Sequence, residues 1–143
     1  MRMGWVLLLC TAGILGGLWF AARLGFGPFS AVASSVPAPL AALHAHLASN
    51  GVSSRVGLVR REHAHVIAKA LFNESEHGRV FVVMWCSTDE HARRLAAETG
   101  GKSIKGPFIL YTTDWPRDDD TTRRLYSAFA SFDTEAALRP PTR

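Results

Sequence analysis

The six histidines are the side chains of this sequence best suited to chemistry, and four of them occur in two His-Ala-His triplets. His63 and His65 fall in a stretch where polar and apolar residues alternate, as in a β-strand. Residues two apart on a strand share a face and lie about 7 Å apart, a spacing at which two imidazoles can share a metal ion. We expect solvent-facing histidines on an edge strand, and a divalent metal site at His63 and His65 is the alternative.

Such a site needs a further ligand from elsewhere in the chain, for which the candidates are His77, His91 and Cys86. The second triplet, His44 and His46, falls on an expected helix, where residues two apart diverge by about 200° and cannot chelate together. Neither zinc-finger spacing nor a paired cysteine motif is present. The primary expectation is therefore a chain without a cofactor, and the metal ion is the alternative.

Cys86 ends an apolar strand directly before an expected helix, where backbone amide dipoles can activate a thiol. A phosphatase loop would place arginine at position 92, and a thioredoxin-like site would place a second cysteine at position 89. The sequence has Ala92 and Asp89 there. We expect Cys86 to be a buried structural thiol, and we assign no catalytic residue.

Two further motifs have weaker chemical meaning. The acidic run Asp118 to Asp120 could bind a cation, but it also suits the positively polarised start of a helix. Asn73-Glu74-Ser75 matches a glycosylation acceptor within a turn, a tripeptide that often arises by chance. We find no glycine-rich phosphate loop, nucleophile elbow or HExxH motif.

An apolar segment from Gly4 to Ala22 carries no charge and has Trp5 and Trp19 near its ends. As a helix its nineteen residues would just cross a hydrocarbon core of about 30 Å. Its length argues against a cleaved signal peptide, as do Trp19 and Phe20, which stand two positions before Ala21 and Ala22 where a signal peptidase needs a small residue. A cleaved signal peptide remains the alternative. The sequence predicts a single-pass membrane anchor.

Few charged residues flank this anchor to indicate its orientation in the membrane. Arg2 and the amino terminus lie before it and Arg23 after it, which favours a cytoplasmic N-terminus and an extracytoplasmic domain. Gly13 and Gly17 have the small-xxx-small spacing through which membrane helices pack, so a homodimer is an option. Glycine is also common in membrane helices without such a role.

Charge beyond the anchor is nearly balanced. The chain has 143 residues with 16 basic and 12 acidic side chains, and 14 of the basic ones follow Ser34. Nucleic-acid binding would require a strong basic face, so we expect no nucleic-acid partner. The length suits one small domain. The expected organisation is an anchor at 1–23, a Gly/Ser/Ala/Pro linker at 24–38, a compact domain at 39–133 and a disordered tail at 134–143.

Hydrophobic periodicity in the domain predicts the order helix, three strands, helix, strand, helix. This corresponds to an α+β sandwich of one mixed four-stranded sheet with about three helices. The strand from 79 to 86 is apolar on both faces and should be central. Its aromatic face, with Phe81, Val83 and Trp85, is expected to be covered by a last helix carrying Phe129 and Phe132.

An anchor, a short linker and a small domain without a catalytic constellation are typical of an accessory or assembly subunit of a membrane or envelope complex. The sequence therefore predicts a protein that acts by contact with a protein partner. The alternative is a membrane-tethered metal-handling or enzymatic domain that uses His63 and His65.

Overall fold

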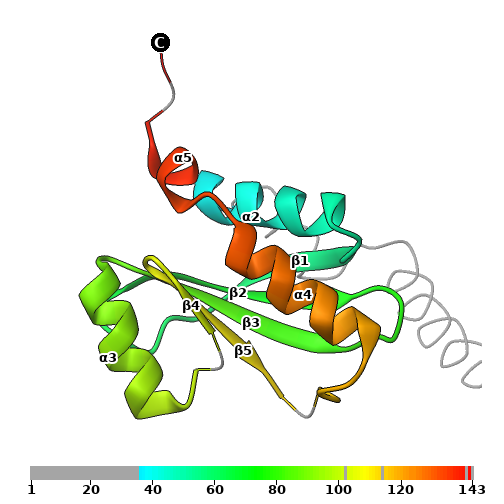
Figure 1. Cartoon of the computed structure of the whole chain (residues 1–143). Coiled ribbons are helices and arrows are strands. Elements are labelled where there is room, and N and C mark those ends of the chain that lie inside the picture. Colours follow the sequence, from blue (N-terminus) through cyan, green and yellow to red (C-terminus); the bar gives the residue numbers. More distant parts are fainter. Residues whose placement is uncertain (1–35, 102, 114, 141, 143) are drawn as a thin grey trace, which may run out of the picture. The chain divides into compact units, whose positions relative to one another are not determined.

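Five antiparallel strands form the sheet at the centre of the domain, in the order β1-β2-β3-β5-β4 (Figure 1). The computed structural model describes residues 36–140 and 142, except 102 and 114. The strands are β1 (Ser54–Val59), β2 (Val66–Glu74), β3 (Val80–Cys86), β4 (Ser103–Lys105) and β5 (Phe108–Thr112). Burial alternates along all nine residues of β2, and a register shift between Val66 and Ala68 puts Val66 on the opposite face from the buried residues that follow it.

The α+β class is confirmed, but the sheet has five strands rather than four and is antiparallel rather than mixed. The difference comes from β4, a three-residue strand that reverses the chain once more before β5. Without it, a strand following a helical return would run parallel to β3. Gly106 has a φ of 54° and makes the tight turn between β4 and β5.

Helices cover the two faces of the sheet unequally (Figure 1). One face carries α2 (Ala38–Ser49) and α4 (Asp120–Ser131), and the short α5 (Thr134–Leu138) contacts α2. The opposite face carries α3 (Asp89–Thr99) alone. We call the first the helical face and the second the α3 face.

The main core lies between the sheet and the helical face. Leu43 of α2 and Phe129 of α4 are fully buried there against the aromatic rings of the central strands. Phe72 and Phe81 stack with their centroids 4.8 Å apart, and Trp115 meets Phe81 edge-on at 5.8 Å. The expectation that the last long helix covers the aromatic face of β3 is thus confirmed.

A smaller cluster lies under α3. Ala92, Leu95 and Ala96 of the helix pack on strand residues of the α3 face, namely Val66, Met84, Cys86 and Ile109. The helix begins at a Thr88 cap, whose hydroxyl accepts a hydrogen bond from the His91 amide, and ends at Gly100 with a φ of 73°. The hydroxyl of Ser87, the residue before the cap, is hydrogen-bonded to the His91 ring.

None of the helices within the described residues is long and apolar enough to span a bilayer. The expected anchor at 1–23, with Gly13 and Gly17, lies outside those residues, as does most of the linker. At the other end, α5 forms in the segment where the sequence predicts a disordered tail. Asp133 caps it by accepting a hydrogen bond from the Ala136 amide.

Candidate functional site

Within residues 36–140, α3 covers the α3 face only in part, which leaves an open row of apolar side chains across the sheet. Strand register places Gly57, Leu71, Val82 and Tyr111 side by side on β1, β2, β3 and β5. These residues are half-buried, and Val80 in the next row is 40% exposed. We call Gly57, Leu71, Val80, Val82 and Tyr111 the open row.

The position of α3 explains why this row is open. Its apolar stripe contacts Met84 and Ile109, which pair with each other one row along the sheet. The helix terminates near Tyr111, whose hydroxyl lies 2.6 Å from the Thr99 hydroxyl in its last turn. Eleven residues of helix span about 16 Å, so a single short α3 cannot cover both ends of the face.

Charged and small residues border the open row. Arg55 pairs with Asn73 at one side of it, and Val59 pairs with Lys69 at the other. Gly57 contributes no side chain at the β1 end of the row. This arrangement suits contact with an apolar segment that carries acidic groups.

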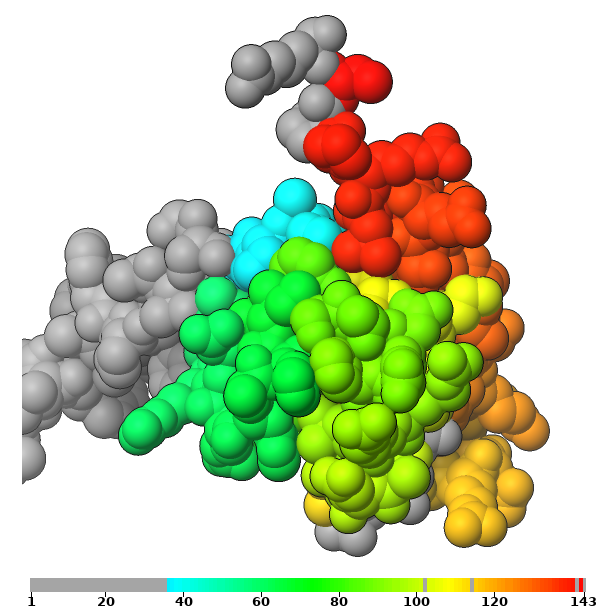
Figure 2. Space-filling model, turned by 90° about the vertical axis from the view of Figure 1, so that its left-hand side faces the viewer, coloured from blue at the N-terminus to red at the C-terminus, as the bar shows by residue number. Residues whose placement is uncertain are grey.

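The predicted metal ligands His63 and His65 lie in the turn before β2, and not on a strand as the alternation suggested. The structure brings His65 to His91, and the two rings stack 3.7 Å apart with an angle of 11° between their planes. His63 lines the same hollow of about 260 Å³, together with Glu62 and Glu98. Figure 2 shows this end of the molecule, where the turn before β2 (green) meets α3 (yellow-green).

Their geometry is not that of a formed chelate. Lone pairs of stacked imidazoles lie in parallel planes and do not converge on one point. His91 Nδ1 lies 2.9 Å from the Ser87 hydroxyl, and the Ser87 amide donates to the His65 carbonyl. Among the described residues, His63, His65, His91 and Cys86 do not form a group of three converging ligands.

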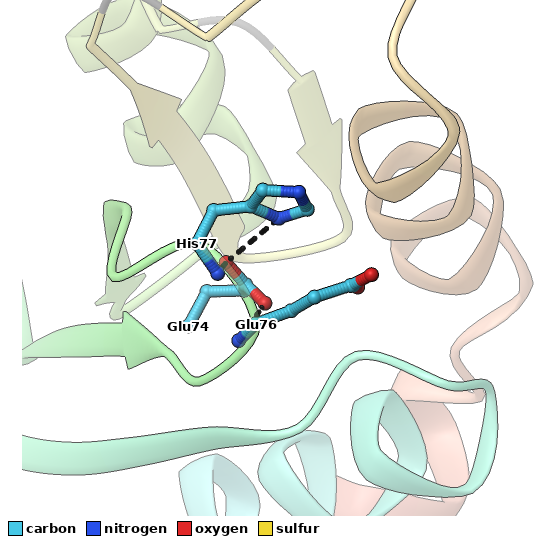
Figure 3. Close-up of side chains that lie close together, drawn as sticks. All are labelled: Glu74, Glu76 and His77. Atoms are coloured by element: carbon cyan, nitrogen blue, oxygen red, sulfur yellow. Dashed lines mark hydrogen bonds and ion pairs between the residues drawn. The ribbon is translucent and has the colours of Figure 1, made fainter.

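His77, another candidate ligand, belongs to a different cluster, with Glu74 and Glu76 in the β2–β3 turn (Figure 3). Glu74 is 2% exposed, and its two carboxylate oxygens accept hydrogen bonds from the Glu76 and His77 amides. Glu76 extends toward α4, where Thr121 and Arg124 donate to it. Both Glu74 oxygens and Oε2 of Glu76 are thus engaged within the protein, so the cluster closes the turn and ties it to α4.

An ion pair fastens the same turn to the start of α4. Arg79 donates to Asp119 over 2.7 Å, and Asp119 also accepts the amides of Thr121 and Thr122 as the helix cap. The guanidinium lowers the pKa of Asp119 to about 2, so the pair is ionised at neutral pH. Of the acidic run, Asp119 thus serves the cap and Asp120 pairs with Arg123.

Cys86 is 1% exposed, beneath α3. Burial raises the pKa of its thiol above the usual range, because the thiolate would lose its hydration. The expectation of a buried thiol is confirmed, and a raised pKa is the opposite of what a nucleophile needs.

A hollow of about 850 Å³ lies between the end of β5 and α4. Part of its polar lining is paired: the Thr112 and Tyr126 hydroxyls lie 2.8 Å apart, and Arg123 pairs with Asp120. The Thr122 hydroxyl in the same lining is buried and has no hydrogen-bond partner among the described residues. Trp115 forms part of the wall and donates to the Val80 carbonyl. These contacts join the β5–α4 loop to β3.

The open row is the surface that sequence reasoning missed. Alternation in β3 separates Val80 and Val82 from Phe81 and Val83, but it does not say which face a helix leaves uncovered. The sequence signal for an uncovered surface was that both faces of β3 are apolar. Comparison of the chain with protein-family models, with curated proteins and with solved structures gives no match.

Proposed function

We propose that this chain is a single-pass membrane protein whose α+β domain acts by protein contact, as an accessory or assembly subunit of a membrane or envelope complex. In this proposal Gly4 to Ala22 is the anchor, the N-terminus is cytoplasmic and the domain is extracytoplasmic. The observation that carries the proposal is the open row on the α3 face.

The open row has the properties of a protein-binding surface. Its side chains are apolar and lie at neighbouring positions on adjacent strands. Because the five-stranded sheet already holds them in place, binding would cost little side-chain and backbone entropy. Each Å² of apolar surface removed from water contributes about 25 cal/mol. Arg55 and Lys69 at the margins favour a partner with acidic residues around an apolar centre.

A charge placed in the open row should strongly weaken partner binding. We expect full-length protein, purified from its native membrane in mild detergent, to elute with a partner in fixed ratio. Val80→Lys should lower recovery of that partner about tenfold or more, because the ammonium would be buried without a counter-charge. Quantitative mass spectrometry of the eluted complexes measures the effect.

Leu138→Lys is the matched control, because Leu138 on α5 is 40% exposed, as Val80 is, and lies away from the sheet. It should leave recovery unchanged. A wild-type protein that elutes alone, or a partner retained equally by both variants, would contradict the proposal.

A second candidate function, a metal-handling domain, is favoured by the meeting of His65 with His91 beside His63. Rotation of one imidazole would let both rings and His63 face a divalent ion. If so, the purified full-length protein should hold zinc or a similar metal in fixed ratio, and His65→Ala and His91→Ala should each lose it. His77→Ala, in the separate turn cluster, should retain it. Elemental analysis that finds no bound metal after incubation and desalting excludes this function.

A further inference from the structure

A basic corner lies where β1 ends and β2 begins. Arg60 and Arg61 follow the last residue of β1, and Lys69 pairs with Val59 across the two strands. Ile67 lies among them and is 41% exposed. These residues line a hollow of about 490 Å³ together with Leu58 and Pro37.

Positive charge at the basic corner is weakly compensated. Arg60 is exposed and forms no ion pair with any residue that the structure describes. Lys69 has only a 3.9 Å contact with Glu62, which is 68% exposed. Arg61 is held in place because it donates to the carbonyl of Ile67 over 3.2 Å. The corner is therefore a preformed cationic surface with one apolar side chain.

The chain enters the described domain at this same corner. Pro37, which lines the hollow, precedes α2 directly. Residues 24–35 lie between Arg23, the end of the expected anchor, and Val36, where the described domain begins. Twelve residues reach at most about 40 Å, so an anchored domain would keep this corner at high effective concentration near the bilayer.

We propose that the basic corner docks on anionic lipid headgroups of the membrane that carries the anchor, an inference that rests on the proposed membrane anchoring. Guanidinium groups bind phosphate oxygens through paired hydrogen bonds. Anionic headgroups attract each such cation, and an exposed isoleucine can enter the interfacial region beside them. Docking there would fix the direction in which the domain presents its open row.

The test uses the full chain reconstituted in bilayer discs with and without phosphatidylglycerol. Ile67→Cys in a Cys10→Ser background provides a site for an environment-sensitive dye, since Cys86 is buried. We expect a blue shift of the dye emission, and quenching by headgroup-attached nitroxides, only in discs that contain phosphatidylglycerol. Raised salt should reverse both effects.

Arg60→Glu should weaken the lipid-dependent signal about tenfold, because it removes one attraction and adds a repulsion. Arg117→Glu is the matched control, because Arg117 is also exposed and also forms no ion pair among the described residues. It should leave the signal unchanged.

The three possible negative results of this experiment lead to different conclusions. A chain that does not remain with the discs in high salt would overturn the membrane anchoring itself. A chain that remains but shows no dependence on phosphatidylglycerol would overturn the docking alone. A dye shift that requires a co-purified protein would reassign the basic corner to a protein partner and also overturn the docking.

Discussion

Phe81→Ala is expected to lower the free energy of unfolding of the domain by about 3 to 5 kcal/mol. The Phe81 ring is 1% exposed, stacks on Phe72 and receives the edge of Trp115. Its removal leaves a cavity between the sheet and the helical face. Domains of this size are stable by about 5 to 15 kcal/mol, so the variant would lose a large part of its stability.

Urea denaturation of residues 36–143, followed by tryptophan fluorescence, measures this effect because Trp115 contacts the missing ring. The control is Ile104→Ala, at a side chain that is 41% exposed, which should cost less than about 1 kcal/mol. Equal stability of the two variants would show that Phe81 is not central to the core.

Glu74→Ala is expected to cost about 2 to 4 kcal/mol, although glutamate is rarely a stability determinant. Its buried carboxylate accepts two turn amides, and the variant would leave both donors without that acceptor. Glu74→Gln keeps one carbonyl oxygen and should restore part of the loss.

Glu76→Ala tests the same turn with an exposed carboxylate, which is 56% accessible and pairs with Arg124. This surface ion pair should contribute less than about 1 kcal/mol. Urea unfolding midpoints of the three variants rank the two carboxylates. A loss at Glu76 as large as that at Glu74 would contradict the assignment of Glu74 as the buried anchor of the turn.

Local patterns were sufficient to predict most elements of this fold. Alternation in β2 and the continuous apolar run of β3 depend on which residues can face a core, and this requirement is local. Ser103–Lys105 is different, because three residues are too few to show a period, and β4 exists through its pairing with β5. The antiparallel sheet follows from that long-range contact.

The candidate site was less predictable, because it depends on docking between distant segments. His65 meets His91 only because α3 packs across the start of β2, a position that spacing within the chain does not encode. Glu74 did carry a signal: it continues the buried phase of Ala70 and Phe72. Because Glu74 is followed by polar turn residues, the sequence did not indicate that it is buried.

The helical face also affects how the domain folds while it is synthesised. Consecutive hairpins let β1, β2 and β3 pair early, and α2 precedes them, but the α4 residues Leu125 and Phe129 emerge much later than Phe81. At typical translation rates this interval lasts roughly 2 to 10 seconds. Until α4 arrives, part of the nascent sheet exposes aromatic surface, so aggregation competes with folding mainly during this interval.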